Sequence, residues 1–381
     1  MFPDIEYLEW ITGRPERADH DLGSSDLHRR RPEGEGVVPP ALEDLPAPPS
    51  DVGLDALLAD AYGVGTENVL VTAGATHANF LAVAAALDGE GEAADGEESR
   101  RERVLVEKPG YEPLTATPQG FGATVDRFRR TPDDDYALDP DRIAGAVTDA
   151  TRCITVTNRH NPSGRLSDRE TLTAASRVAE DAGVPLLVDE VYAPFDGERG
   201  DGPLGGPTAA DLPNAVVTNS LTKFHGLGSL QVGWLVADEP FVERARSIEF
   251  HLPGVAGPSV ALARRALHDE RRRREAPEDA DAGRLDDDSR ARIAENHDLL
   301  ASFVAGRDDL RGFVAPGCTY GFLAHESADG DEVVEAAWEA GVLVVPGRFF
   351  ADDDRFRLSL GRDPSAARAG LDAFGDVLDS L

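Results

Sequence analysis

Short apolar runs bounded by turn residues recur through the first two thirds of the chain. Seven of them are expected to be strands: 69–72, 104–106, 123–125, 153–157, 185–189, 215–218 and 232–236. They are nearly continuous and rich in Val, Ile and Leu, which is typical of strands buried on both faces of a sheet. Helical patterns over 78–87 and 168–182 lie between strands, and Asp168 is a suitable N-terminal cap for the second. The alternation predicts an α/β fold with a mostly parallel, seven-stranded sheet.

The pattern changes after residue 257. The expected helices are 259–268, 291–304 and 332–340, and the expected strands are 320–323, 342–345 and 356–359. This mixture predicts a smaller α+β domain towards the C-terminus. Residues 269–290 are a dense run of charges, which we expect to form a solvated loop or helix face rather than a binding site. The acidic, glycine-rich stretch 88–103 predicts a surface loop.

The charge of the chain is strongly one-sided. Its 381 residues include 71 acidic and 38 basic side chains, a net charge of −33, and only two of the basic residues are lysines. This composition resembles that of haloarchaeal cytoplasmic proteins, and it indicates a halophilic protein, because self-repulsion is screened at ~1 M salt, where the Debye length is ~3 Å. The field should repel nucleic acids and acidic membranes.

Three further features favour a cytoplasmic location. No apolar run approaches the ~20 residues of a membrane span. The N-terminal segment lacks the pattern of a signal peptide. Cys153 and Cys318 are the only cysteines and have no metal-site spacing, so neither a disulfide scaffold nor a metal site is expected.

Polar side chains follow several of the expected strands. Thr76 comes after the first, Asn161 after the fourth, Asp189 ends the fifth and Lys223 follows the sixth. Ligands of open parallel sheets bind at the carboxyl ends of the strands, so these four side chains are candidates for one site. Each has an ordinary alternative: Asp189 could cap a helix, and Asn161 could belong to a β-turn.

Lys223 carries more weight than the others. Almost all basic residues of this chain are arginines, so an ordinary surface cation would be expected to be arginine. A retained lysine indicates a role that a guanidinium cannot fill, such as an amine that forms an imine. Lys108, the other lysine, is expected at the surface.

Together these residues resemble the class I/II aminotransferases, the fold-type I enzymes that use pyridoxal 5′-phosphate (PLP). The resemblance covers about Asp21 to Arg357. Its motifs stand in family order: Gly74-Ala75-Thr76, Lys108-Pro109-Gly110-Tyr111, Asn161-Pro162-Ser163-Gly164, Asp189-Glu190-Val191-Tyr192, Ser220-Leu221-Thr222-Lys223, Val345-Pro346-Gly347 and Arg357. Each motif is moderately specific, and the ordered set is strong.

The resemblance implies a role for each central residue. Lys223 would hold PLP as a Schiff base and then move the substrate proton, and Asp189 would pair with the pyridinium nitrogen. Asn161 and Tyr192 would hydrogen-bond the cofactor's O3′, and Tyr111 would stack on its ring. The catalytic residues would thus be Lys223, Asp189 and Tyr192.

The remaining implied contacts lie at the two ends of the site. Arg357 would bind the substrate α-carboxylate through two parallel hydrogen bonds, although it could also be a surface arginine of a strand. The residues implied at the phosphate are Ala75, Thr76, Ser220 and Thr222.

Two positions depart from the family pattern. Gln231 stands where the family usually has a basic residue that binds the phosphate, and residues 45–53 lack the tyrosine that usually reaches the phosphate across the dimer. A lost charge-assisted hydrogen bond costs about 1.5–3 kcal/mol, so we expect weaker PLP retention than is usual.

The resemblance also implies the organisation and the reaction. We expect a large PLP-binding domain over 46–284, and an N-terminal arm and small domain over 1–45 and 285–381. The expected enzyme is a homodimeric aminotransferase that exchanges an amino group between an L-amino acid and a 2-oxo acid. Tyr7 and Trp10 would lie in the arm, over the site or a partner subunit.

Two alternatives stay open. A PLP-dependent C–S lyase or amino-acid decarboxylase would use the same Lys, Asp and Tyr on the same fold. A non-catalytic binding protein is disfavoured by intact Lys223, Asp189 and Tyr192. His160 and His225 flank the motifs, and we favour structural roles for both.

Overall fold

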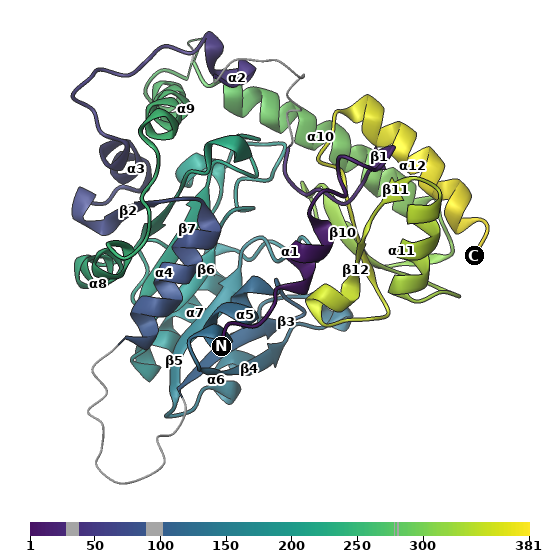
Figure 1. Ribbon diagram of the computed structural model, residues 1–381, viewed down its shortest axis with the longest axis horizontal. Coiled ribbons are helices and arrows are strands. Elements are labelled where there is room, and N and C mark those ends of the chain that lie inside the picture. The colour runs from purple at the N-terminus through teal and green to yellow at the C-terminus, as the bar shows by residue number, and fades with distance from the viewer. Residues whose placement is uncertain (28–37, 89–101, 278, 280–281) are drawn as a thin grey trace.

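The computed structural model describes residues 1–27, 38–88, 102–277, 279 and 282–381 (Figure 1). Its largest sheet has seven strands in the order β2-β8-β7-β6-β5-β3-β4. They are β2 (Val69–Thr72), β3 (Arg103–Lys108), β4 (Thr124–Arg129), β5 (Thr151–Thr157), β6 (Leu186–Asp189), β7 (Ala215–Ser220) and β8 (Gly233–Val236). Only β8 runs antiparallel to its neighbours. The predicted α/β fold with a mostly parallel, seven-stranded sheet is confirmed.

Helices cover both faces of this sheet (Figure 1). One face packs against α3 (Leu54–Tyr62), α6 (Pro140–Ala146), α7 (Arg169–Ala182) and α9 (Gly257–Glu275). The other packs against α4 (Ala75–Leu87), α5 (Pro113–Gly120) and α8 (Glu239–Glu249). Within β3, Leu105 joins the first apolar cluster, while Val104 and Val106 join the second. Alternate residues are therefore buried on opposite faces, which explains the continuous apolar runs.

The predicted start of α7 is confirmed in detail. Asp168 has extended backbone geometry, and its Oδ1 accepts a hydrogen bond from the Thr171 N–H at 2.8 Å. Gly183 then ends the helix with a positive φ of 67°, a conformation that favours glycine.

A second sheet is antiparallel and contains β12 (Val345–Pro346), β13 (Phe356–Ser359), β10 (Tyr320–His325) and β9 (Leu310–Arg311), in that order. Three helices share its apolar cluster: α10 (Arg284–Ala305), α11 (Gly330–Glu339) and α12 (Pro364–Leu378). The expected strand 342–345 is divided into β11 (Val342–Leu343) and β12. Figure 1 shows this unit to the right of the large sheet.

The N-terminal segment joins the two units. Helix α1 (Glu6–Ile11) lies between them in Figure 1, and β1 (His20–Asp21) pairs in parallel with β11. Helix α2 (Pro40–Glu43) follows. The short 3₁₀ helices are η1 (Thr66–Asn68), η2 (Pro132–Asp134), η3 (Pro203–Gly205), η4 (Gly228–Leu230) and η5 (Gly347–Phe350).

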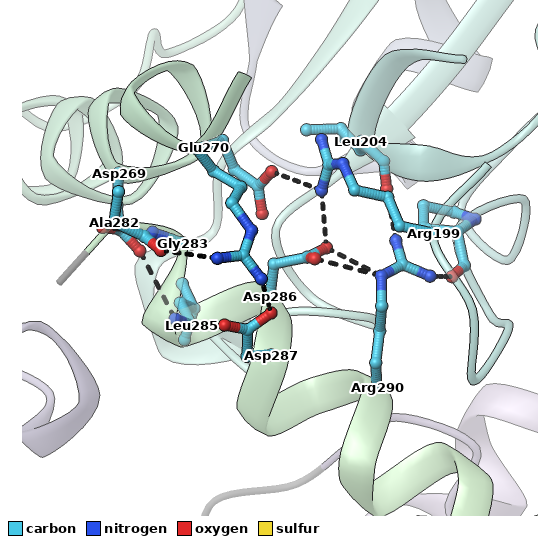
Figure 2. A network of polar contacts seen from close by, with 12 residues as sticks. Arg199, Leu204, Asp269, Glu270, Ala282, Gly283, Leu285, Asp286, Asp287 and Arg290 are labelled. Carbon is cyan, nitrogen blue, oxygen red and sulfur yellow. Dashed lines mark hydrogen bonds and ion pairs between the residues drawn. The ribbon is translucent and has the colours of Figure 1, made fainter. Parts of the chain in front are cut away.

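The prediction for the charged run 269–290 is wrong in part. Asp269 and Glu270 on α9, and Asp286 and Arg290 on α10, are buried. Figure 2 shows why: Arg199 Nη1 lies 3.0 Å from Glu270 Oε2 and 2.9 Å from Asp286 Oδ1. Arg199, on the loop after β6, thus lies between carboxylates of two helices, and the opposite charges compensate one another in the interior.

Arg290 ties the same helix to the loop after β6. Its Nε lies 3.0–3.1 Å from the two carboxylate oxygens of Asp286. Its terminal nitrogens donate to four main-chain carbonyls, those of Pro194, Asp196, Glu198 and Leu204, at 2.9–3.3 Å. One arginine thus provides hydrogen-bond partners for a loop with little regular structure.

Most of the expected surface loop 88–103, namely 89–101, lies outside the described residues. Among the helices that the structure describes, none has the length and apolar character to cross a membrane.

Candidate active site

A cavity of about 330 Å³ opens at the carboxyl ends of the large sheet's strands. The loops after β2, β3, β5, β6 and β7 contribute to it, together with α1 and β13. All ten side chains singled out by the sequence line it: Ala75, Thr76, Tyr111, Asn161, Asp189, Tyr192, Ser220, Thr222, Lys223 and Arg357. Residues separated by up to 282 positions therefore meet in one space.

Lys223 lies three residues beyond the end of β7. Its Nζ is 5.6 Å from the ring centre of Tyr192. Burial of the amine acts to lower its pKa, but Tyr192, Asp26, Tyr7 and Tyr111 together raise it by more, so the pKa of Lys223 lies above the ordinary value for lysine.

Asp189 ends β6 at the floor of the cavity and is buried. Its Oδ2 accepts a hydrogen bond from Asn79 Nδ2 at 2.8 Å, and its Oδ1 accepts one from the Val191 N–H at 3.2 Å. Burial raises the pKa of the Asp189 carboxyl, although both hydrogen bonds lower it. A cation beside this carboxylate would be stabilised.

Asn79 is a site residue that the sequence analysis missed. It lies on α4, and its Oδ1 accepts a hydrogen bond from Thr218 Oγ1 at 2.6 Å, which fixes the orientation of the amide towards Asp189. The available signal was a single polar residue within the otherwise apolar stretch from Ala78 to Leu87.

Arg357 is 1% exposed, which excludes the alternative of a surface arginine. Its Nη1 donates to Asn161 Oδ1 at 2.8 Å, and its Nη2 donates to Tyr7 Oη and to the Gly23 carbonyl, both at 3.1 Å. Its Nε is buried and has no hydrogen-bond partner, and no carboxylate of the described residues pairs with it. A buried cation without a counter-ion is suited to an anionic ligand.

Asn161 is held in place by a buried chain of hydrogen bonds. Its main-chain N–H donates to Thr157 Oγ1 at 3.0 Å, and that hydroxyl donates to Glu107 Oε1 at 2.5 Å. Glu107 also accepts the Thr157 N–H at 2.8 Å and pairs with Arg130 Nη1 at 2.8 Å. The ion pair beneath the sheet edge therefore positions the loop that carries Asn161.

Aromatic side chains form another wall of the cavity. Tyr7 of α1 meets Tyr111 edge to face at 6.0 Å between ring centres, and Glu112 holds the start of α1 through the N–H groups of Glu6 and Tyr7 at 3.2 and 2.7 Å. The expectation that Tyr7 belongs to an arm over the site is confirmed for this chain's own cavity.

At the opposite end of the cavity, an anion would meet N–H and hydroxyl groups but no arginine or lysine at position 231. Helix α4 begins here after Gly74, whose φ is 87°. Gly233 approaches so closely that a Cβ there would lie 2.7 Å from the Ala75 nitrogen. Gln231 lines the same cavity, exposed, and its Nε2 donates to the Gly228 carbonyl at 3.2 Å. Helix N–H groups and the hydroxyls of Ser220 and Thr222 are therefore available to a phosphate.

The profile of aminotransferase class I and II matches residues 46–374. The chain belongs to the class I and II aminotransferase family. It is accordingly an enzyme of the PLP-dependent aminotransferase type, with PLP as its cofactor, and amino acids and 2-oxo acids are the substrates that the family implies.

Individual relatives are similar over long stretches. Capreomycidine synthase of Streptomyces vinaceus is 28% identical over 99% of this chain and 94% of its own length. The aromatic amino acid aminotransferase of Rhodococcus jostii is 30% identical over 84% of this chain and 78% of its own. A PLP-dependent aminotransferase structure from Streptococcus suis aligns with a TM-score of 0.80 over 100% of this chain and 98% of that one, at 20% identity, which shows the shared fold-type I fold.

The neighbouring histidines of the enzyme do not line the cavity. His160 is buried, with its ring nitrogens 2.7 Å from Ser163 Oγ and 3.0 Å from the Pro109 carbonyl oxygen. His225 is buried 3.4 Å from Glu270 Oε1. Their predicted structural roles agree with these positions. Lys108 is half-buried at the end of β3, rather than exposed as expected.

Proposed function

We propose that Lys223, Asp189 and Arg357 carry out amino-group exchange between an L-amino acid and a 2-oxo acid. One observation carries this proposal: the Lys223 amine, the buried Asp189 carboxylate and the buried Arg357 guanidinium line the same cavity, and the Nε of Arg357 has no hydrogen-bond partner. The amine handles the proton, the carboxylate stabilises a cationic ring, and the guanidinium binds the α-carboxylate.

The residues present fit PLP. Lys223 would hold it covalently, and Asp189 is the one described carboxylate at the cavity floor that could pair with a pyridinium nitrogen. Asn161 and Tyr192 are placed as hydrogen-bond partners for the ring, Tyr111 as its stacking partner, and Ala75, Thr76, Ser220 and Thr222 as phosphate ligands. When bound, PLP supplies an electron-withdrawing ring that stabilises negative charge at the substrate Cα.

The protein's own side chains do the rest of the work. Lys223 Nζ, once free, would take the proton from the substrate Cα, and Tyr192 stays beside it because its hydroxyl lies 2.6 Å from Ser25 Oγ. Arg357 orients the substrate through two parallel hydrogen bonds, for which Tyr7 and Asn161 already align its plane. Tyr7, Leu8 and Ile11 of α1 line the cavity, and their bulk would limit the access of water to the bound substrate.

The test is a visible absorption spectrum in molar KCl with added PLP, recorded before and after a panel of amino acids. We expect an absorption band from the lysine-bound cofactor, its loss with one class of amino acid, and its recovery with a 2-oxo acid. Lys223→Ala should show no such band. A band that persists while pyruvate, ammonia or carbon dioxide accumulates would indicate a lyase or decarboxylase instead.

We further propose a homodimer that works in a salt-rich cytoplasm. Phe250 and Leu252, between α8 and α9, are 80% and 37% exposed, which is unusual for large apolar side chains and supports an interface there. Light scattering should give twice the 40.7 kDa chain mass. The melting temperature should rise between dilute buffer and molar KCl. The proposed domain boundaries lie at 45/46 and 284/285, and limited proteolysis would test them.

A further inference from the structure

The segment after β1 runs beside β13, the strand that carries Arg357. The Leu22 N–H donates to the Leu343 carbonyl at 2.9 Å, and the Leu22 carbonyl accepts from the Ser359 N–H at 2.8 Å. The next carbonyl in the chain, that of Gly23, accepts from Arg357 Nη2 at 3.1 Å. One edge of the guanidinium is therefore held by the main chain of this segment.

Asp21 holds the same peptide group from its other side. Its Oδ1 accepts hydrogen bonds from the Gly23 N–H at 3.0 Å and from the Ser24 N–H at 2.9 Å, which is the arrangement of an Asx turn. The Ser24 N–H and the Gly23 carbonyl belong to one planar trans peptide group, in which they point in opposite directions. Asp21 and Arg357 therefore bind opposite ends of a single peptide plane, and the carboxylate fixes the direction in which the carbonyl points.

The Asp21 carboxylate is itself fixed. Its Oδ2 pairs with Arg362 Nη2, just beyond β13, and Asp21 is buried. The main chain at Arg362 is held in turn, because Asn296 Nδ2 of α10 donates to the Leu360 and Arg362 carbonyls, both at 2.8 Å. The ion pair thus ties the turn to the same part of the small unit that carries Arg357.

The intervening peptide leaves Arg357 able to bind an anion. A carboxylate in direct contact would neutralise the guanidinium and compete with the carboxylate of a substrate. The acceptors that Arg357 meets in the described part of the chain are instead neutral: the Asn161 amide, the Tyr7 hydroxyl and the Gly23 carbonyl. A hydrogen bond at one end of a peptide group also polarises the group and strengthens the bond at its other end. Asp21 can therefore orient Arg357 without occupying it.

We propose that Asp21 is a positioning residue for the substrate α-carboxylate: through the peptide between Gly23 and Ser24, it sets the orientation of Arg357. The inference rests on the proposed function, in which Arg357 binds that carboxylate. Without the Asp21 acceptor the peptide can rotate, the carbonyl loses its direction, and the guanidinium no longer meets the carboxylate in a single orientation. The loss falls on substrates that carry the carboxylate.

The experiment compares each amino acid with the amine that lacks only its α-carboxylate. Single-turnover loss of the cofactor band is measured with L-phenylalanine against phenethylamine, L-alanine against ethylamine, L-lysine against cadaverine, and L-glutamate against γ-aminobutyrate. For Asp21→Ala we expect the rate divided by the half-saturating concentration to fall about tenfold with each reactive amino acid, the lower end for a hydrogen bond to a charged group. The values for the amines should stay within about twofold of the parent, because no bond to Arg357 is at stake.

Two variants separate positioning from loss of structure. Asp21→Asn keeps an oxygen that accepts from both N–H groups but loses the charge, so its loss with amino acids should be about threefold. If Asp21→Ala does not fold, Asp21→Asn replaces it, and the absence of any loss then overturns the inference. The matched control is Asp329→Ala. Its Oδ1 likewise accepts two main-chain N–H groups, those of Asp331 and Glu332, both at 2.9 Å, but Asp329 does not line the cavity, so all values should stay within about twofold.

A double-mutant cycle tests the route through Arg357. In an Arg357→Lys protein, the further change Asp21→Ala should alter the amino-acid values by less than about twofold, because the guanidinium that Asp21 orients is gone. The cycle uses amino acids alone, so it decides the question where the amines react too slowly to measure.

The outcomes separate the inference from the proposed function. If Asp21→Ala slows amino acids and amines alike, or has its full effect in the Arg357→Lys protein as well, the inference is overturned while the aminotransferase function stands. If no amino acid removes the band from the parent, the proposed function fails, and the inference fails with it. A loss that is confined to amino acids and disappears without Arg357 supports the inference.

Discussion

Gln231 offers a direct test of how the phosphate end of the cavity binds its ligand. It precedes β8, whose first residue, Gly233, pairs with Thr72 and touches the start of α4. A longer, charged side chain at 231 would therefore point into the region where α4 begins. Gln231→Arg should tighten PLP binding, because it adds a guanidinium to a site whose proposed phosphate ligands are hydroxyls and N–H groups.

The size of the gain follows from exposure. A charge-assisted hydrogen bond contributes about 1.5–3 kcal/mol, and solvent screening at this exposed position places the gain at the lower end. About 1.4 kcal/mol corresponds to a tenfold lower dissociation constant. The backbone adds no penalty, because Gln231 already has a φ of 52° and an unbranched arginine tolerates that conformation as glutamine does.

The assay is a titration of cofactor-free protein with PLP, followed by absorbance at two salt concentrations. The tenfold gain should shrink between about 0.1 M and 1 M KCl, because the Debye length falls from about 10 Å to about 3 Å. Gln231→Glu is the matched control and should weaken binding by a similar factor. Equal affinities for all three proteins would refute the reasoning, and so would nanomolar binding by the parent chain.

Three further changes test the buried groups. Arg357→Lys should raise the half-saturating amino-acid concentration about tenfold or more in single-turnover kinetics, because lysine cannot make two parallel hydrogen bonds to a carboxylate; an unchanged value would remove Arg357 from the substrate site. Glu107→Gln should lower the free energy of unfolding by about 3–5 kcal/mol in denaturant titrations, because Arg130 stays buried without its counter-ion. The control is Asp211→Asn, which breaks the exposed pair with Arg169 and should lower the free energy of unfolding by less than about 1 kcal/mol. Burial raises the pKa of Glu190 to about 8, so the folded state keeps a proton that the unfolded state releases near the ordinary value of 4.5. Between these two pH values the free energy of unfolding should therefore fall by about 1.4 kcal/mol per pH unit. Glu190→Gln should remove that slope, and parallel profiles of unfolding free energy against pH for the variant and the parent would contradict the argument.

Local pattern predicted the large sheet and four of the ten cavity residues, and the resemblance to the class I/II aminotransferases implied the other six. Apolar runs report strands buried on two faces, and the carboxyl ends of such strands share an edge, so Asp189 and Lys223 had to be neighbours of Asn161 and Thr76. The motifs themselves supplied the remaining members.

What the sequence could not predict depends on contacts between distant segments. The loop that follows β1 lies at the cavity next to the pairing of β1 with β11. The pattern predicted β11 as part of the expected strand 342–345, but the two-residue β1 has no recognisable pattern. The prediction of a solvated surface for residues 269–290 was wrong in part for a related reason. Glu270 and Asp286 are buried there because they pair with Arg199, which is distant from both in the sequence.

The pairing of β1 with β11 has a consequence for how the protein is made. His20 pairs with Val342, which the ribosome adds 322 residues later, so the two strands cannot pair before Val342 has been synthesised. The large sheet, whose strands end at Val236, contains its own apolar clusters and can assemble earlier. The segment that carries Tyr7 therefore cannot take its final place until β11 has been made, and an unfinished chain holds Lys223 and Asp189 without the part of the cavity wall that Tyr7 provides.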